Sequence, residues 1–381
     1  MLRLWLTLLL SATLMSAAAQ MWNGTDTLYG NEWIEYSQSY YRIDVGEEGL
    51  YRIPYAALQA AGLPVAEVSG SQYQLWRMGE EVPLYSSTDA PLQEGEFLEF
   101  YGQPNEGELD AYLYGNPETR VNPWYSLVND TMAYYLTWVE AGAPTQRYSS
   151  VPNTLSDLPP AEAWHWSESR VVHTDVLAKQ EERFVYNQGN SVLAIPSSTY
   201  KSDGFTDGYK KEQSFDLPCP GLFPAGPPAQ AEVRFISNAA KAEHELEVYW
   251  GNTPVLQDTT FLGSHFFKLE REWAAGELSD GLSVQIRGLN GNNDRYAAGG
   301  ARVRYPRDFA MGGAARANID LPAGSGPRYL ELAGMEGATP AIVYDLSRQE
   351  RLEAVLEDGV HRVRLNAQTG ARQVVAATQW R

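Results

Sequence analysis

The sequence has almost no cysteine. Cys219 is the one thiol among 381 residues, so no disulfide can form within the chain. A chain without disulfides depends on apolar cores, and its hydrophobic fraction of 44% is sufficient to build them. Cys219 stands in the proline-rich stretch DLPCPGLFPAGPP, a poor setting for a nucleophile that needs a neighbouring base. We therefore expect Cys219 to be structural.

Positive charge is also scarce. The chain has 29 lysines and arginines against 48 acidic residues, which gives a formal net charge of −19. Such a field repels phosphates and anionic headgroups, so we exclude nucleic acid and anionic lipid as partners. The charge favours a solvated acidic surface, and binding of divalent cations is the alternative.

Histidine is rare and lacks metal-ligand spacing. No two of the five histidines form an H-x-x-x-H pair, so no zinc site is expected; they are His165, His173, His244, His265 and His361. Two loops, NGTDTLYGNE at 23–32 and GLNGNNDRYAAGG at 288–300, have oxygen-rich side chains that calcium prefers. Neither fits the twelve-residue calcium loop, which needs a Glu at its twelfth position, and turn formation is the favoured interpretation. The sequence thus predicts no catalytic, cofactor-binding or metal-binding residues, and no cofactor.

Long apolar runs are missing beyond the first residues. Arg3, the apolar run from Leu4 to Met15 and the small residues at 17–19 are typical of a signal peptide over 1–19, cleaved after Ala19. The run is too short for a comfortable membrane span, and no later segment could span a bilayer as a helix. We expect an exported protein in the periplasm, on the outer membrane surface or outside the cell.

Helical periodicity is nearly absent too. The 33 glycines, 22 prolines and 23 tyrosines, with many short alternating segments, predict a mainly β chain of tandem antiparallel β-sandwich-like domains with few short helices. We expect an N-terminal β-rich domain at 20–151 and a linker at 152–163. Alternating segments at 164–381 predict strands of one or more β-sandwich domains, in which 310–381 either closes the sandwich or forms a separate layer. The clearest alternating sets are Leu246, Val248 and Trp250, and His361, Val363 and Leu365.

The first domain has clear local signals. Alternation at Tyr41, Ile43 and Val45 predicts a strand, and Pro54 and Gly62 bracket a short helix. The stretch YQLWRMGEEVPLY predicts a hairpin that turns at MGEE.

The stretch EFYGQPNEGELDAYLYGN at 99–116 combines aromatic rings with turn-forming residues. It is either a sugar-binding platform of exposed rings or a strand followed by an acidic loop and a second short extended piece. Cross-strand packing of rings favours the second interpretation. We therefore expect Phe100 and Tyr135 in the core, the loop 105–108 exposed, and AYLYG extended.

The segments from 40 to 138 resemble a known family. YRIDVGEEGLYRIPYAALQAAGL, LWRMGEEVPLY, EGEFLEFYGQPNEGELDAYLYG and NPWYSLVNDTMAYYLTW are similar, in order and spacing, to the region that precedes the peptidase domain in gingipain-like cysteine peptidases. Within that family they are closest to type IX secretion sortases. The strands that end in ARVRYPRDF and VYDLS resemble the following β-sandwich less specifically.

The resemblance implies a non-catalytic part of an exported Gram-negative protein. In the family a Cys and a His act in a caspase-like α/β domain, and no position of this chain matches that pattern. The peptidase domain would lie beyond Arg381, where the chain stops after the strand-like VVAATQWR, as if interrupted. The triplets Asp26-Thr27-Leu28 and Asp130-Thr131-Met132 resemble the O-glycosylation sequon of such bacteria.

Two hypotheses follow. The first is a non-catalytic N-terminal portion that positions or shields a downstream peptidase domain, or that binds type IX secretion components. The second is a stand-alone cell-surface carbohydrate- or protein-binding β-sandwich protein. Trp164 and Trp166, in WHW, are either a stacking platform or the start of a strand.

Overall fold

The computed structural model shows a mainly β protein, as the sequence predicts. The described residues are 21–22, 27–28, 30–188, 191–238, 243–278, 281–291 and 294–381, without the side chains of 21–22, 27–28, Tyr112 and 179–201. The predicted signal peptide, 1–19, lies outside them. Among the described residues, no helix is long and apolar enough to cross a membrane. The chain forms two compact units, which are described separately; unit 1 is residues 1–44, 53–100 and 133–147, and unit 2 is residues 45–52, 101–132 and 148–381.

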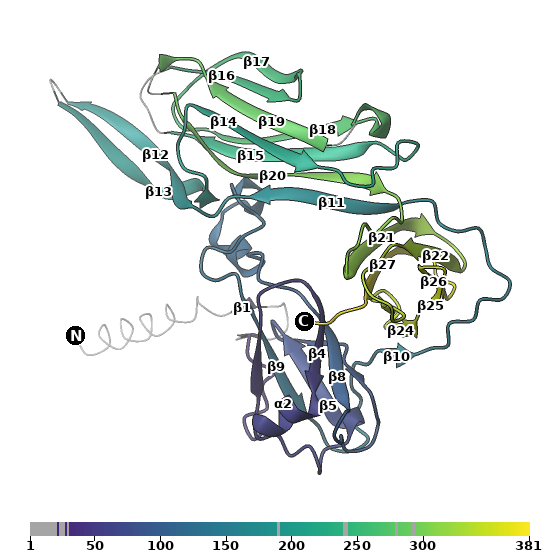
Figure 1. Ribbon diagram of the computed structural model, residues 1–381. Helices are drawn as coiled ribbons and strands as arrows, with labels where there is room; N and C mark the ends of the chain where they lie inside the picture. Colours follow the sequence, from purple (N-terminus) through teal and green to yellow (C-terminus); the bar gives the residue numbers. More distant parts are fainter. Residues whose placement is uncertain are drawn as a thin grey trace, which may run out of the picture. The chain divides into compact units, whose positions relative to one another are not determined.

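Residues mainly from unit 1 form two small sheets (Figure 1). The first has the order β3-β9-β5-β6, with β3 Tyr41–Val45, β9 Met132–Trp138, β5 Tyr73–Arg77 and β6 Glu80–Val82. The second has the order β4-β8-β7, with β4 Gly49–Pro54, β8 Phe97–Gly102 and β7 Tyr85–Ser86. Short elements β1 Met21–Trp22, β2 Thr27–Leu28 and η2 Gly70–Gln72 complete the fold's N-terminal part.

Two local predictions in unit 1 are confirmed. Helix α2, Tyr55–Ala60, follows Pro54 as N-cap residue, and Gly62 comes after its end with a φ of 83°. The predicted hairpin pairs β5 with β6 across a two-residue turn. Met78 and Gly79 in this turn both have positive φ, 52° and 84°, as a type I′ hairpin turn requires.

Of the two aromatic residues predicted to lie in the core, Phe100 is buried and Tyr135 is not. Phe100 is fully buried and contacts Tyr134, with ring centroids 5.3 Å apart. Tyr135 was expected in the core, but it is only partly buried on the opposite face of β9. There its ring lies 5.5 Å from Trp33, which also stacks on Trp76 at 5.6 Å. A one-residue shift exchanges the faces of a strand, and both faces of β9 carry rings.

Unit 2 contains a β-sandwich and a C-terminal β-structure. A nine-stranded sheet has the order β10-β24-β23-β27-β21-β11-β20-β15-β18, and a four-stranded sheet has the order β14-β19-β16-β17. The sandwich strands are β11 His165–Val172, β14 Glu212–Pro218, β15 Ala229–Ser237, β16 Glu243–Trp250, β17 Thr253–Leu262, β18 Phe266–Trp273, β19 Gly281–Gly288 and β20 Tyr296–Arg307. β12 Val176–Gln188 and β13 Ser191–Thr206 form a separate long hairpin.

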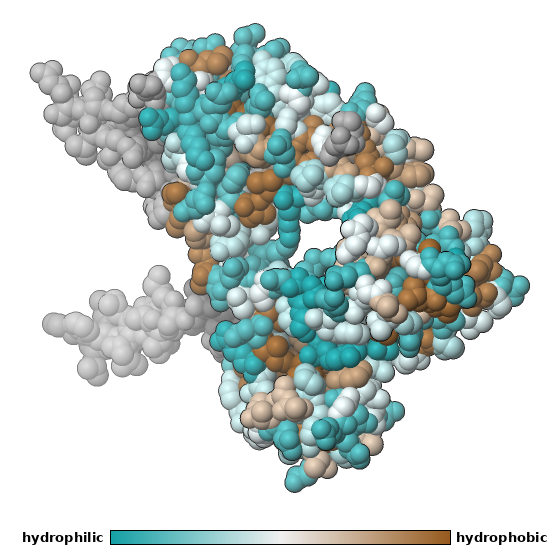
Figure 2. Space-filling model, viewed as in Figure 1, coloured by the Kyte–Doolittle hydropathy of each residue, from teal (hydrophilic) through white to brown (hydrophobic). Residues whose placement is uncertain are grey.

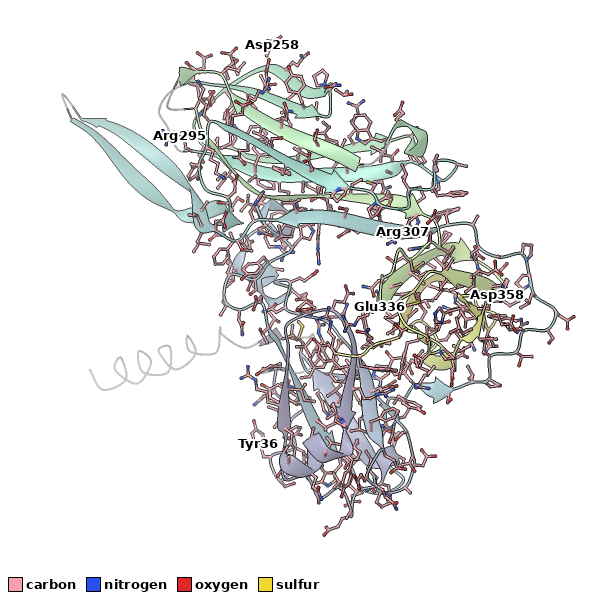
Figure 3. All side chains as sticks on the ribbon, viewed as in Figure 1. Tyr36, Asp258, Arg295, Arg307, Glu336 and Asp358 are labelled. Carbon is pink, nitrogen blue, oxygen red and sulfur yellow. The ribbon has the colours of Figure 1, made fainter. Side chains whose placement is uncertain are left out.

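The sandwich core lies between the two sheets. Leu246, Val248 and Trp250 point inward from β16, as their alternation predicts, and pack with Phe235 and Val303. Burial of such side chains stabilises by about 1.5 to 3 kcal/mol each. Asp258 on edge strand β17 has a φ of 47°, close to a register irregularity in its pairing with β16 (Figure 3).

The C-terminal strands surround a second apolar core. They are β21 Arg316–Gly324, β22 Arg328–Ala333, β23 Ile342–Asp345, β24 Glu350–Glu353, β25 Val355–Glu357, β26 Val360–Leu365 and β27 Gly370–Ala377. His361, Val363 and Leu365 are buried along β26, which confirms its predicted alternation. β21 joins β11 through the pair Trp166 and Asp320, so the nine-stranded sheet includes strands from both cores.

The predicted linker contacts the C-terminal strands. β10, Ser149–Ser150, pairs in parallel with β24. The Asn153 side chain donates to the carbonyl oxygens of Glu353 and Arg362, at 3.0 and 2.8 Å, and accepts from the Arg364 amide. These bonds hold the start of 152–163 on the β24–β26 region.

Candidate functional site

The outer face of the sandwich sheet carries charged residues in rows. On β11, β20, β15 and β18 every second side chain faces away from the apolar core. One row across these strands is Glu168, Arg304, Gln230 and Glu272, and the next is Arg170, Arg302, Glu232 and Glu270. We call this surface the charged face.

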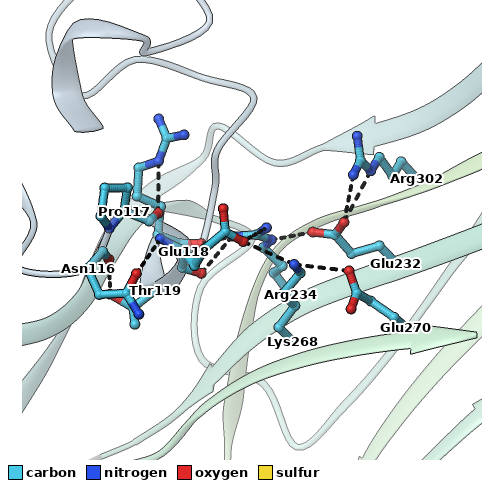
Figure 4. Close-up of polar contacts among 10 residues, drawn as sticks. Asn116, Pro117, Glu118, Thr119, Glu232, Arg234, Lys268, Glu270 and Arg302 are labelled. Atoms are coloured by element: carbon cyan, nitrogen blue, oxygen red, sulfur yellow. Dashed lines mark hydrogen bonds and ion pairs between the residues drawn. The ribbon is translucent and has the colours of Figure 1, made fainter.

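Arg234 is the buried centre of the charged face (Figure 4). Its guanidinium is ion-paired with Glu232, which also accepts from Arg302 at 2.8 Å. It donates to the backbone oxygens of Glu118 and Arg120, at 2.9 and 3.1 Å. A buried charge must be paired and hydrogen-bonded, and these three partners of Arg234 meet that requirement.

A long loop therefore docks on the charged face. We call residues 103–131 the docked loop; it contains the short helices η3 Leu109–Leu113 and η4 Pro117–Thr119. Glu118 pairs with Lys268 at 3.0 Å, and this hydrogen bond is the main reason that its pKa is lowered. The Asn116 side chain accepts from the Glu118 amide and caps η4.

Two glycines of β20 let the docked loop approach the sheet backbone. A Cβ at Gly299 would lie 2.0 Å from the Val121 carbonyl oxygen. A Cβ at Gly300 would lie 2.3 Å from the Val171 carbonyl oxygen and 3.2 Å from the Trp124 ring. Gly299 cannot hold a side chain while the loop stays in place, and Gly300 cannot hold one while β11 is paired with β20.

Polar bonds complete the docking. The Asn122 side chain donates to the carbonyl oxygens of His173 and Phe205, at 2.9 and 3.1 Å. The Tyr114 hydroxyl donates to the Asp203 carbonyl oxygen at 3.0 Å, and burial raises the pKa of this hydroxyl. The prediction that AYLYG is extended is wrong up to Leu113, which ends the 3₁₀ helix η3, and Tyr114 after it anchors the loop.

The predicted exposure of 105–108 is largely wrong. Only Glu108 is exposed; Asn105 and Glu106 are partly buried and Gly107 is buried. Asn105 donates to the Asn129 carbonyl oxygen at 2.6 Å, and Glu106 forms an ion pair with Arg170. Composition identified a loop, but the charged face on which it packs is distant in sequence.

A groove of about 510 Å³ lies at the edge of the docked loop. Its lining includes four arginines, Arg170, Arg304, Arg307 and Arg316. Five acidic residues line it as well: Glu48, Glu106, Glu108, Glu168 and Asp320. Trp166 lies in the same groove, and Arg307 is at the end of β20 (Figure 3). We call it the charged groove.

Charge and burial oppose each other in the charged groove. Burial raises the pKa values of Glu168 and Asp320, while nearby arginines oppose that shift. Arg304 lies over the Trp166 ring, 4.7 Å from its centroid, which covers one face of the indole. The WHW motif therefore begins β11, and its second tryptophan packs against an arginine. The groove offers both hydrogen-bond donors and hydrogen-bond acceptors.

The histidines occupy separate places in the described fold. His165 donates through Nδ1 to the Trp166 carbonyl oxygen at 2.9 Å, and burial lowers its pKa to about 4, which keeps it neutral. His361 accepts from the Ala341 amide at 3.0 Å. His173 and His265 make edge contacts with Phe215 and Phe261, respectively.

The most organised polar cluster includes His244. Its Nδ1 lies 2.8 Å from Asp294, whose carboxylate also accepts from the Tyr296 hydroxyl at 2.7 Å. The amides of Asn290 and Glu245 donate to the same carboxylate. Asp294 thus stabilises the turn of the 288–300 loop, and among the described residues no three His, Cys, Asp or Glu side chains form a metal-binding group.

Cys219 lies in the sandwich core. Burial raises the pKa of its thiol to about 11, and its Sγ lies 3.7 Å from the Leu217 carbonyl oxygen. A thiol with this pKa carries almost no thiolate at neutral pH. The Asp130-Thr131-Met132 triplet is within the described loop, where the Thr131 hydroxyl donates to Asp130 at 3.1 Å; Asp26 of the other triplet and most of 23–29 are outside the described residues.

Comparison with known proteins shows similarity of fold. No protein-family model and no curated protein matches the chain. Among solved structures, it is similar to dimeric latent PorU from Porphyromonas gingivalis, with a TM-score of 0.54 and 13% identity over 88% of this chain. The match covers 31% of the PorU chain, so this chain spans less than a third of that protein.

Two further structures are much less similar. A family 35 carbohydrate binding module from Clostridium thermocellum has a TM-score of 0.20 and 8% identity, over 35% of this chain and 97% of the module. A Paenibacillus cycloisomaltooligosaccharide glucanotransferase has a TM-score of 0.20 and 6% identity, over 61% of this chain and 47% of the enzyme. Scores this low support no argument, whereas the PorU match shows that this chain shares its fold with a region of PorU.

Proposed function

We propose that this chain is a non-catalytic scaffold of an exported, gingipain-like protein related to type IX secretion sortases. It positions or shields a caspase-like peptidase domain. The observation that carries the proposal is the similarity to PorU, which extends over 88% of this chain but only 31% of PorU. The sequence resemblance at residues 40–138 independently supports the same family.

The site chemistry supports a scaffold rather than an enzyme. The charged face uses its arginines and glutamates to hold the docked loop, with Arg234 at its buried centre. Cys219 is buried with a raised thiol pKa, a poor state for a nucleophile. The charged groove combines both signs of charge, which suits contact with a polar protein surface.

The first test is the reading frame that follows codon 381. A continuing frame that encodes alternating strands and helices with His and Cys supports the proposal. That domain, produced separately, should bind this chain in isothermal titration calorimetry. A stop codon with no downstream frame, together with binding on a glycan array, would instead favour a stand-alone carbohydrate-binding protein.

The second test is a peptidase assay. The purified chain should not cleave a peptide library in a thiol-dependent manner, and Cys219→Ala should behave like the parent. Cleavage that the Cys219→Ala variant loses would reject the scaffold proposal. Mass spectrometry of the secreted protein tests export, since retention of Met1 contradicts cleavage after Ala19.

A further inference from the structure

The docked loop exposes three apolar side chains. Leu109, Leu113 and Val128 have 53%, 70% and 84% of their surface exposed. Single exposed apolar residues are common on proteins, and Figure 2 shows hydrophobic residues in small separate groups on the face that it draws. These three differ because they belong to two turns of one loop that are joined together. We call them the apolar patch.

Partly buried hydrogen bonds hold the two turns in place. The Asp110 carboxylate accepts from the Leu127 amide at 2.6 Å, which joins η3 to the turn before Val128. The Ser126 hydroxyl accepts from the Val128 amide at 3.2 Å. Arg120 donates to the Gly107 carbonyl oxygen at 2.7 Å from the other side. A loop ordered in this way loses little conformational entropy when a partner covers its apolar side chains.

The surroundings of the apolar patch are acidic. The docked loop contains five acidic residues and one arginine, which gives 1 − 5 = −4; the acids are Glu106, Glu108, Asp110, Glu118 and Asp130. Glu108 and Asp130, which are close in sequence to Leu109 and Val128, are exposed. Glu118 and Glu106 are paired with Lys268 and Arg170 on the charged face. An apolar centre with an acidic rim is complementary to an apolar pocket with a basic rim.

We propose that the apolar patch docks into a protein surface that has an apolar pocket ringed by lysine and arginine. Anionic lipid is disfavoured because the rim is acidic. A second copy is disfavoured because each chain carries a net charge of −19. The inference rests on the proposed function only for the identity of the partner, which would be the peptidase domain.

The probe is a synthetic amphipathic peptide of leucine and lysine, with a leucine and glutamate peptide of the same pattern as the charge control. The triple variant Leu109→Ser, Leu113→Ser, Val128→Ser keeps every charge of the chain. The matched control replaces three other exposed apolar residues, Leu158→Ser, Leu262→Ser and Leu289→Ser. Fluorescence anisotropy reports binding, and circular dichroism verifies that both variants are folded.

We expect the leucine–lysine peptide to bind the parent and the control variant. The triple variant should bind at least about 10-fold more weakly, because contacts at the centre of an interface dominate affinity. Equal binding to the two variants overturns the inference, and so does equal binding of the glutamate peptide. Binding to phosphatidylglycerol vesicles that the triple variant loses would also overturn it, in favour of a membrane.

The peptidase domain separates this inference from the proposed function. If the peptide distinguishes the variants but no peptidase domain binds the parent chain, the proposed function fails and the apolar patch stands. If the domain binds the parent and the triple variant equally, the docking inference fails while the proposed function stands.

Discussion

The two faces of the sandwich sheet in unit 2 are built from the same strands but are stabilised in different ways. On the inner face, Phe235, Val303 and Leu269 pack in an apolar core. On the outer face, Glu232, Arg234 and their neighbours form ion pairs beneath the docked loop. Apolar packing is tolerant of its partner, whereas a buried charge requires specific partners at specific atoms. The inner face therefore explains stability, and the outer face explains why one loop occupies one position.

The largest effect is expected on the inner face. Phe235 is fully buried and stacks on Phe267 with centroids 4.8 Å apart. Phe235→Ala should reduce the free energy of unfolding by about 4 kcal/mol, from lost burial and the cavity left behind. Urea denaturation measures it, with Glu270→Ala on the exposed outer face as the control. Equal midpoints for the two variants would contradict the assignment of the faces.

Removal of the buried arginine should have the next largest effect. Arg234→Ala leaves Glu232 and two loop carbonyl oxygens without this donor. Because Glu232 keeps its ion pair with Arg302, we expect the free energy of unfolding to fall by about 3 kcal/mol, the lower end of the range for a broken buried pair. Hydrogen exchange of the amides at 117–124 should increase as well. If these amides exchange as slowly in the variant as in the parent, Arg234 does not hold the loop.

Gly299→Ala should act on the docked loop alone. Its Cβ would meet the Val121 carbonyl oxygen, so the loop must move or the strand must bend, at a cost of about 2 kcal/mol. We expect faster hydrogen exchange at 120–124, with the sandwich core protected as in the parent. Gly291→Ala, where a Cβ meets nothing within 4 Å, is the control for the alanine itself, although its positive φ of 67° adds local strain.

Substitution of Asp320 should have a smaller effect, and it should stabilise the protein instead of destabilising it. Burial raises the pKa of this carboxyl, so the folded protein holds the proton more tightly than the unfolded chain. That contribution to stability is present below the ordinary pKa of 3.8 and is lost as pH rises through the folded-state value. Asp320→Asn avoids this loss and should raise the melting temperature at neutral pH but not below pH 3.8. A melting temperature that is lowered at neutral pH but not below pH 3.8 would show instead that Arg304 needs this carboxylate.

The smallest effect is expected at the groove rim. Glu106 and Arg170 pair with 38% and 33% of their side chains exposed, where solvent screens the charges. Glu106→Gln should therefore cost only about 0.5 kcal/mol, and less in high salt. Thermal melts at low and high salt measure this difference. A loss as large as that of Arg234→Ala would mean that the rim, and not Arg234, holds the loop.

Local signals predicted local structure well. The helix after Pro54 and the hairpin at Met78 and Gly79 depend on backbone conformations that a few neighbouring residues determine. Strand alternation also identified the buried residues of β16 and β26, where one face is clearly polar. On β9 both faces are aromatic, so alternation could not decide between Tyr134 and Tyr135.

Long-range docking could not be predicted from the sequence in the same way. Arg234 and Glu232 fit the pattern of an outward polar face, and nothing nearby in sequence indicates that a loop more than a hundred residues earlier covers them. The docked loop has the composition of a solvent-exposed loop because its hydrogen bonds use side chains such as Asn122 and Asp110. The one available signal was Gly299-Gly300 inside a strand, where glycine marks close approach of another backbone.

Gly299 and Gly300 of β20 can also help to identify distant relatives of this protein. Two short motifs that are distant in sequence, Val-Asn-Pro-Trp at 121–124 and Ala-Gly-Gly in β20, depend on each other because the loop backbone packs against the glycines. A genome search for Val-Asn-Pro-Trp followed later in the chain by Ala-Gly-Gly should recover relatives too divergent for whole-chain comparison. Proteins with a side chain at the position of Gly299 should lack both the Val-Asn-Pro-Trp motif and the loop that contains it.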